Sequence, residues 1–376
     1  MLYKTLNELP TPALVLDLEV LERNVENMAR RADRLGVELR PHFKTPKSLQ
    51  AAELLREAGA CGLTVSTLAE ARAVILGGGG CDPWDDVTWA FPVILGRLDE
   101  VAAVANLREG VALRLVVDSA DAVTALKTQL APKVDRCHVW LKVDCGYGRC
   151  GVDPRTESAL DLARRLHDAD RLVFDGILSH SGHAYSVQGS EALASVAEEE
   201  RSVMVGFAQR LRDAGVEVRG ISVGSTPAMS AVRSLEGVTE ARPGNYVFHD
   251  YSQVLIGSCD VRDCALTVVS QVVSHQPGSA HCILDAGALT LSKDAGPVWS
   301  DPPSYGRIYR DYESAELEDG FSIVSLSQEH GRVDGPLSVG TRVRIQPNHS
   351  CLVVPNFDAY HVVRGDQVVD CWPIVR

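Results

Sequence analysis

Residues 12–45, PALVLDLEVLERNVENMARRADRLGVELRPHFKT, contain the structural unit on which the predicted fold depends. The unit begins with a short apolar segment, PALVLDL, that predicts a β-strand. In the stretch after it, apolar residues recur every three or four positions, at Leu18, Leu21, Val25, Met28 and Ala32. This period predicts an amphipathic helix, and the pair Leu35–Gly36 predicts its end. A second apolar segment starts at Val37, so the stretch predicts strand, helix, strand.

The same unit is repeated along the first half of the chain. Candidate strands begin at Pro12, Val37, Cys61, Asp86, Ala112 and Cys137, at intervals of 25, 24, 25, 26 and 25 residues. Two more follow, FDGILSHSG at 174–182 and GISVGST at 220–226. Alternating strands and helices predict an α/β protein, and eight units predict a (β/α)8 TIM-type barrel.

Two questions about this barrel stay open. A ninth candidate strand, EARPGNYVF at 240–248, is one more than a barrel needs, so either the first or the last candidate lies elsewhere. A doubly wound sheet is the alternative architecture, but no GxGxxG motif follows the first strand.

The pattern changes near Tyr251. Residues 255–287, 337–354 and 360–375 contain alternating or apolar strands that are separated by Gly, Pro and Asp turns. We therefore expect two domains, a barrel over residues 1–250 and an antiparallel β domain over residues 251–376.

Composition excludes several classes of protein. Acidic residues outnumber basic ones by 50 to 37, a net charge of −13, whereas a nucleic-acid binder needs a basic face. No apolar run approaches the roughly 18 residues of a membrane helix, and the N-terminus does not resemble a secretory signal. The ten cysteines form no CxxC pair, which favours reduced thiols. We expect a cytoplasmic protein without nucleic-acid or membrane partners.

Polar residues follow several of the predicted strands, at the face where the loops of a barrel converge and chemistry gathers. RPHFKT places Lys44 at the end of the second strand, where partial desolvation would suit a Schiff-base amine. Arg149 lies in DCGYGRCG after the sixth strand. The seventh strand ends in SHSGHAY, and its two histidines, His180 and His183, resemble a metal pair but need not face the same side.

Two further motifs predict binding sites for a phosphate and a metal. SVGSTP at 222–227 and ARPGN at 241–245 offer hydroxyls and backbone N–H groups that suit a phosphate. In the second domain, NHSC at 348–351 follows the strand VRIQP. His349 and Cys351 are two residues apart, so in extended chain they would point the same way and could share a metal. Imidazole and thiolate favour zinc over magnesium or calcium.

Together these motifs resemble the fold-type III pyridoxal-phosphate (PLP) enzymes, and most closely the D-threonine aldolase/D-serine dehydratase family. The resemblance extends from about Thr11 to Asp358 and rests on TPALVLDLEVLERNV, RPHFKT, GLTVSTLAEA, DCGYGRCGV, SHSGHAY, SVGSTP, ARPGNYVF and PNHSC. It implies an alanine-racemase-like barrel followed by a β domain, a lyase activity and a homodimer.

The resemblance also implies a role for each candidate residue. Lys44 would bind PLP covalently. Arg149 would lie near the ring and the phenolic oxygen of the cofactor, and His180 would lie beside the ring. These three residues are the catalytic candidates. Tyr185 would line the pocket. The phosphate would be bound by Ser225, Thr226, Gly244 and Asn245, and the metal by His349 and Cys351.

The metal motif predicts the reaction. Aldolases of this family tend to carry His-x-Asp, suited to manganese or magnesium, whereas dehydratases tend to carry His-x-Cys, suited to zinc. Cys351 therefore favours a PLP- and zinc-dependent dehydratase, although Mn²⁺ or Mg²⁺ remains possible. Its substrate would be D-serine or a related D-3-hydroxy amino acid, such as 3-hydroxyaspartate, converted to a 2-oxo acid and ammonia. Lys44 would remove the α-proton and zinc would help the 3-hydroxyl to leave.

Three alternatives remain. A metal-dependent D-threonine or 3-hydroxy-D-aspartate aldolase would release glycine and an aldehyde. An amino-acid racemase would need a second base and no metal. A non-catalytic PLP-binding protein is generally a lone barrel, so the predicted β domain counts against it.

Overall fold

The first repeat unit folds as its pattern predicts. The structure, a computed structural model, describes residues 3–300 and 303–376. Strand β1 (Ala13–Asp17) leads into helix α1 (Leu18–Arg34), whose N-cap Asp17 accepts a hydrogen bond from the Val20 amide. The helix buries Leu21, Val25, Met28 and Ala32, and the chain turns at Gly36 with φ of 68°. This turn needs a left-handed backbone, which glycine adopts without a steric cost.

The following strands form a curled sheet of eight parallel strands. They are β2 (Glu38–Leu39), β3 (Leu63–Val65), β4 (Asp86–Pro92), β5 (Ala112–Val117), β6 (Cys137–Lys142), β7 (Leu172–Leu178), β8 (Gly220–Val223) and β9 (Glu240–Ala241). Their order is β2-β9-β8-β7-β6-β5-β4-β3. From β3 to β9 each strand lies beside its neighbour in sequence. This order excludes the doubly wound alternative, because in that arrangement the order of the strands reverses at one point in the sheet.

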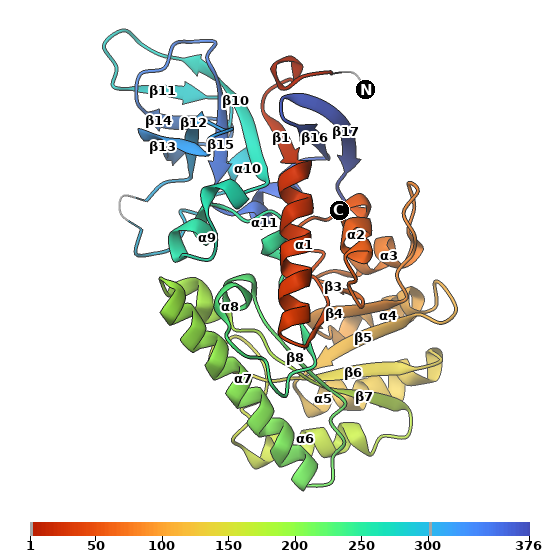
Figure 1. Ribbon diagram of the computed structural model, residues 1–376. Coiled ribbons are helices and arrows are strands. Elements are labelled where there is room, and N and C mark those ends of the chain that lie inside the picture. Colours follow the sequence, from red (N-terminus) through yellow and green to blue (C-terminus); the bar gives the residue numbers. More distant parts are fainter. Residues whose placement is uncertain (1–2, 301–302) are drawn as a thin grey trace.

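Helices lie outside the curled sheet (Figure 1). They are α2 (Leu49–Glu57), α3 (Leu68–Leu76), α4 (Leu98–Ala105), α5 (Ala120–Ala125), α6 (Glu157–His167), α7 (Ser190–Asp213) and α8 (Thr226–Ala231). A short helix, α9 (Tyr251–Ile256), leads to the second sheet.

The second sheet contains the candidate strand that the parallel sheet does not use. It has nine strands in the order β11-β14-β13-β12-β15-β10-β1-β16-β17, so the first candidate strand is the one outside the parallel sheet. The strands other than β1 are β10 (Leu266–Ser274), β11 (His281–Leu284), β12 (Gly306–Asp311), β13 (Glu316–Leu326), β14 (Gly331–Asp334), β15 (Arg342–Pro347), β16 (Ala359–Arg364) and β17 (Gln367–Pro373). Short helices α10 (Ala288–Leu291) and α11 (Ser350–Val353) interrupt them.

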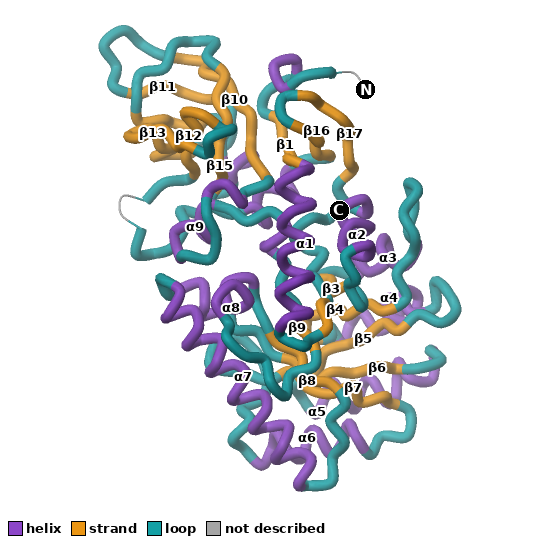
Figure 2. Tube along the Cα trace, viewed as in Figure 1, coloured by secondary structure: helices purple, strands orange, loops and turns teal. Residues whose placement is uncertain are grey.

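This sheet is antiparallel, as predicted, except at one pair of strands. β1 runs antiparallel to β10 and parallel to β16, and β10 also pairs with β11. The β domain is therefore built from both ends of the chain, and α1 carries the chain from it to the curled sheet (Figures 1 and 2).

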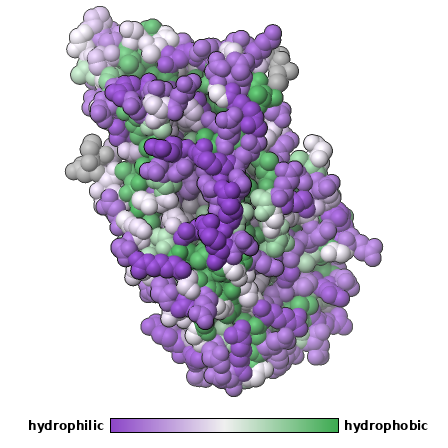
Figure 3. Space-filling model, in the orientation of Figure 1, coloured by the Kyte–Doolittle hydropathy of each residue, from purple (hydrophilic) through white to green (hydrophobic). Residues whose placement is uncertain are grey.

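Hydrophilic side chains cover most of the face in Figure 3, with hydrophobic groups between them. Among the helices of the described residues, none combines the length and the apolar character that crossing a membrane requires.

Candidate active site

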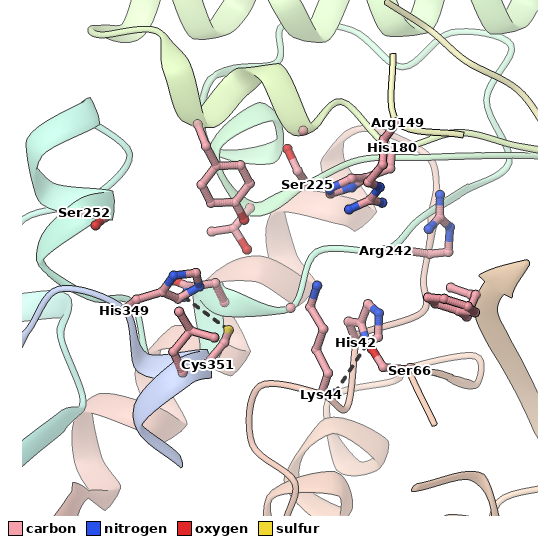
Figure 4. Close-up of a pocket in the computed structure, with 18 of the residues that line it drawn as sticks. His42, Lys44, Ser66, Arg149, His180, Ser225, Arg242, Ser252, His349 and Cys351 are labelled. Carbon is pink, nitrogen blue, oxygen red and sulfur yellow. Dashed lines mark hydrogen bonds between the residues drawn. The ribbon is translucent and has the colours of Figure 1, made fainter. Parts of the chain in front are cut away.

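A cavity of about 890 Å³ lies where the loops after the parallel strands meet the β domain. The residues to which the family resemblance gives a catalytic, cofactor-binding or metal-binding role all line it: Lys44, Arg149, His180, Tyr185, Ser225, Thr226, Gly244, Asn245, His349 and Cys351. Figure 4 shows Lys44 between the pair His349 and Cys351 on one side and His42 and Arg242 on the other.

The loop after β2 presents Lys44 to this cavity. Phe43 is fully buried, its amide donates to the Thr64 carbonyl at 2.7 Å, and its own carbonyl accepts from the Lys47 amide at 2.8 Å. The Lys44 amide donates to Nδ1 of His42 at 3.4 Å (Figure 4). The backbone on both sides of Lys44 is therefore held in place while its side chain extends into the cavity.

Cations surround Lys44. Lys142 at the end of β6, Arg149 in the loop after it, and Arg242 after β9 all line the cavity. Among the described residues, the salt bridges of the cavity wall are Lys47–Glu70 and His349–Asp294, which leaves these cations without a carboxylate partner. Burial, followed by the charge of Arg242, lowers the pKa of Lys142 to about 8. The cavity is thus suited to an anionic ligand.

The two histidines near Lys44 are neutral. Burial, and then the charge of Lys44, lowers the pKa of His42 well below its usual range. Burial, and then the charges of Lys142 and Lys44, does the same for His180. The His180 ring packs edge-on against Tyr147, with ring centroids 6.1 Å apart, and Arg149 lies over the Tyr147 ring at 5.2 Å.

Some residues of the motif SHSGHAY line the cavity and others lie outside it. His183 does not line the cavity; its Nε2 lies 3.9 Å from the Glu199 carboxylate, and its ring lies 6.4 Å from that of Tyr147, which His180 also contacts. Tyr185 does line the cavity, and burial raises its pKa.

The segments predicted to hold a phosphate lie together at the start of α8 and after β9. The Ser225 hydroxyl caps α8, and the Thr226 hydroxyl accepts from the Tyr246 amide at 3.0 Å. A Cβ atom at Gly244 would lie 2.7 Å from the Cβ of His42, so only glycine lets this loop approach the Lys44 loop so closely. Hydroxyls, backbone amides and nearby cations make this corner of the cavity suitable for a phosphate.

His349 and Cys351 meet by a geometry that differs from the predicted one. β15 ends at Pro347, His349 is extended, and Cys351 lies in the first turn of α11, so the two are not alternate residues of a strand. Their side chains still lie next to each other at the cavity wall (Figure 4). The Cys351 sulfur also lies 3.2 Å from the Thr45 hydroxyl, directly beside Lys44.

The ionisation of this pair is shifted by its neighbours. Burial lowers the pKa of His349, but the hydrogen bonds with Asp294 and Cys351 outweigh it and raise the pKa to about 11. Burial raises the pKa of Cys351, but His349 and Lys44 outweigh it and the net shift is downward. A metal would have to displace the proton that the raised pKa keeps on His349. An imidazole bonded to a carboxylate and lying beside a thiol of lowered pKa is otherwise a typical donor set for a metal.

Several residues of the site were not predicted from the sequence: His42, Lys142, Arg242, Asp250 and Asp294. A lysine at the end of the apolar segment CHVWLKVD, next to the DCGYGRCG loop, is a signal that would have indicated Lys142. Asp294 lies far from His349 in the chain and contacts it at 2.7 Å between Oδ2 and Nδ1. Nothing in the local sequence indicates that contact.

Glu38, Cys61 and Glu240 form a second group of potential metal ligands, which none of the sequence motifs predicts. None of the three lines the cavity, and Glu240 is already bonded to Arg40 Nε at 2.8 Å and to the Ser222 hydroxyl at 2.5 Å. Burial raises the pKa of Cys61 to about 12, which opposes the thiolate that a metal requires.

Comparison with known proteins agrees with this arrangement. Residues 16–252 match the model of "Alanine racemase, N-terminal domain" and residues 265–363 that of "Putative serine dehydratase domain". D-threo-3-hydroxyaspartate dehydratase of Delftia sp. (strain HT23) is 38% identical over 98% of both chains. D-serine dehydratase of Dictyostelium discoideum is 30% identical over 97% of this chain and 96% of the relative.

Solved structures show the same relationship. The structure of the Delftia dehydratase covers 100% of both chains with a TM-score of 0.92 and 36% identity. That of D-threonine aldolase from Filomicrobium marinum covers 100% of this chain and 98% of the other, with a TM-score of 0.86 and 25% identity. The chain therefore belongs to the PLP-dependent, alanine-racemase-like family of lyases that includes the D-3-hydroxyaspartate and D-serine dehydratases and the D-threonine aldolases.

Proposed function

We propose that this protein is a PLP- and zinc-dependent dehydratase that eliminates water from a D-3-hydroxy amino acid to give a 2-oxo acid and ammonia. The observation that carries the proposal is the contact between Thr45 and Cys351, 3.2 Å between hydroxyl and sulfur. It places an imidazole–thiol pair next to the lysine that would move the α-proton. D-Serine and 3-hydroxyaspartate are the proposed substrates, and the names of the Delftia and Dictyostelium relatives support them.

The residues around Lys44 fit PLP. Its phosphate would lie against Ser225, Thr226, Gly244 and Asn245, and Lys44 would hold its aldehyde carbon. When bound, PLP supplies an electron sink that acidifies the Cα–H bond of an attached amino acid.

The chain's own groups would then handle the protons. The Nζ atom of Lys44 would accept the α-proton, because it is the amine that reaches the middle of the cavity (Figure 4). Burial lowers the pKa of His180 and His42, which makes both weak proton acceptors, so neither would compete with Lys44 as a base. Arg149 would keep a positive charge beside the cofactor ring. These roles are proposals from geometry and family resemblance.

The pair His349 and Cys351 fits a zinc ion better than manganese or magnesium, because thiolate is a soft ligand. Asp294 forms a hydrogen bond with Nδ1 of His349, so Nε2 is the ring nitrogen that could bind the metal. A zinc ion there would supply Lewis acidity for the departure of the 3-hydroxyl group. In support, one solved structure is a cysteine-to-alanine variant of a D-threo-3-hydroxyaspartate dehydratase in a metal-free form.

Product analysis tests the proposal. The purified protein is incubated with D-serine, D-threonine and D-3-hydroxyaspartate, and 2-oxo acid, ammonia, glycine and aldehyde are all measured. We expect 2-oxo acid and ammonia, their loss on chelation, and their return with added zinc. Cys351→Ala should abolish elimination, whereas Cys371→Ala, at an exposed thiol, is the matched control.

Two results would contradict the proposal. Full 2-oxo acid formation by the metal-free protein would exclude the role of zinc. Chelation-sensitive release of glycine and aldehyde without 2-oxo acid would identify an aldolase, the second candidate, to which D-threonine aldolase of Arthrobacter sp, 28% identical over 97% of this chain, is a guide.

We also propose that the curled sheet closes as a (β/α)8 barrel. The Phe43 amide donates to the Thr64 carbonyl at 2.7 Å and the Thr64 amide to the Pro41 carbonyl at 2.9 Å, which joins the segment after β2 to β3, the two ends of the strand order. The division into residues 1–250 and 251–376 remains a proposal, modified by the pairing of β1 within the second sheet. A homodimer and a cytoplasmic location remain predictions.

A further inference from the structure

Asp250 is a buried carboxylate that joins the two binding regions of the cavity. It is 1% exposed and lies just before α9, where its Oδ1 atom accepts from the Gln253 amide at 3.1 Å. Its Oδ2 atom accepts three further hydrogen bonds, from Nδ2 of Asn245 at 2.7 Å and from the amide and hydroxyl of Ser350 at 3.0 and 3.2 Å.

The two partners of Oδ2 belong to different parts of the chain. Asn245 lies after β9, in the segment proposed to hold the cofactor phosphate. Ser350 stands between the proposed metal ligands His349 and Cys351, in the β domain. The same Asn245 amide group also donates to the Ser350 hydroxyl at 3.0 Å and to the Cys351 sulfur at 3.7 Å. One carboxylate oxygen therefore fixes the phosphate segment and the metal segment relative to each other.

This connection has an energetic consequence. Asn245 is 4% exposed and Ser350 is fully buried, so neither can exchange its bond to Asp250 for one to bulk water. Hydrogen bonds to a buried charged group are stronger than those between neutral groups. A ligand that orders one segment will therefore, through Asp250, reduce the cost of ordering the other segment for a second ligand.

We propose that Asp250 is a positioning residue that couples the binding of PLP to the binding of the metal ion, so that each ligand raises the affinity of the protein for the other. The inference rests on the proposed function, because it takes the cofactor site and the metal site from there. It adds an energetic link between the two sites that neither site implies by itself.

The test is a set of four dissociation constants. The protein is freed of both ligands, and PLP is titrated by its absorbance with and without zinc. Zinc is titrated against a fluorescent chelator with and without PLP. In the native protein each ligand should raise the affinity for the other by roughly 5- to 150-fold, and the two ratios must agree because linkage is reciprocal. In Asp250→Asn both ratios should fall to within about twofold of one, because the negative charge is lost and the single amide oxygen cannot accept from the Gln253 amide and from the Asn245 and Ser350 donors together.

Asp17→Asn is the matched control. Asp17 is also a buried N-cap carboxylate, bonded to the Val20 amide at 3.1 Å and the Tyr312 hydroxyl at 3.0 Å, but it contacts neither binding segment. This variant should retain the native ratios. If Asp250→Asn does not fold, Ser350→Ala takes its place, since it removes only the hydroxyl and should lower the ratios in part.

The possible results are distinct. Independent binding of the two ligands to the native protein would overturn the coupling while leaving the proposed function intact. Affinity ratios in Asp250→Asn that equal those of the native protein would also overturn the role of Asp250. If the ratios in that case fell to one in Thr45→Val, the coupling would be assigned to the contact between Thr45 and Cys351. Failure of the native protein to bind PLP or zinc at all would overturn the proposed function, and the coupling with it.

Discussion

Replacement of Gly244 by alanine tests how the cofactor loop and the Lys44 loop are brought together. A Cβ atom at this position would lie 2.7 Å from the Cβ of His42, 3.1 Å from its carbonyl oxygen and 3.2 Å from the Thr45 hydroxyl. The φ angle of Gly244 is −134°, outside the left-handed region that favours glycine, so the main effect of the substitution is the collision. The two loops must separate to admit the methyl group.

The size of the effect follows from this collision. Forcing an extra carbon into a packed site costs about 1–3 kcal/mol. Because 1.4 kcal/mol is a tenfold change in affinity, the apparent affinity for PLP should fall by about 5- to 150-fold if the strain is present only in the cofactor complex and the free protein relaxes to avoid it. If the strain is present with and without the cofactor, the cost will appear instead as a lower free energy of unfolding. Absorbance titration of PLP and denaturant unfolding of the cofactor-free protein measure the two contributions.

Gly206 provides the control. It lies within α7, and a Cβ there would meet no atom within 4 Å, so Gly206→Ala should raise stability by roughly 0.5–1 kcal/mol and leave PLP binding unchanged. If Gly244→Ala binds PLP as tightly as the native protein and unfolds at the same denaturant concentration, the two loops are not held at contact distance, and this account of the site is wrong.

Three other predictions concern single residues of the cavity. Lys44→Ala should lose the pyridoxyl label that borohydride introduces, as shown by peptide mapping; a label on another lysine would contradict the assignment. Asp294→Ala should weaken zinc binding by about 10- to 100-fold in chelator competition, because it removes the partner of Nδ1 of His349, and an unchanged zinc affinity would show that the imidazole is oriented without it. In the cofactor-free protein, burial lowers the pKa of Lys142 from 10.5 to about 8, so between these pH values the unfolded chain holds a proton that the folded chain does not. The free energy of unfolding, relative to Lys142→Met, should therefore rise by about 3 kcal/mol from pH 8 to 10.5, and a difference independent of pH would contradict the shift.

Much of the fold could be predicted because its signals are local. The spacing of Leu21, Val25 and Met28 predicted α1, and the structure buries all three. Helical periodicity depends only on residues three or four apart, so it survives in any tertiary context. The repeat of about 25 residues predicted parallel strands in series, and seven of the eight strands of the curled sheet follow one another in sequence order.

The candidate site could be predicted to the extent that its residues follow strands or occur in family motifs. Lys44, Arg149 and Cys351 all line one cavity, although they lie more than 100 residues apart in the chain. The sequence predicted that His349 and Cys351 lie close together because both would be in extended chain and point the same way. That reason was wrong, because the chain turns into α11 between them. The residues that support the site were not predicted at all.

The amino-acid sequence by itself therefore determined the elements, their order and the family motifs, since each of these depends on neighbouring residues. Tertiary structure decided the features that depend on partners distant in the chain. Strand β1 left the parallel sheet because its backbone pairs with β10 and β16, more than 240 residues away. Asp294 and Asp250 became parts of the site for the same reason. A buried carboxylate must find hydrogen-bond donors, and the fold brings those donors from other segments, where no local pattern records them.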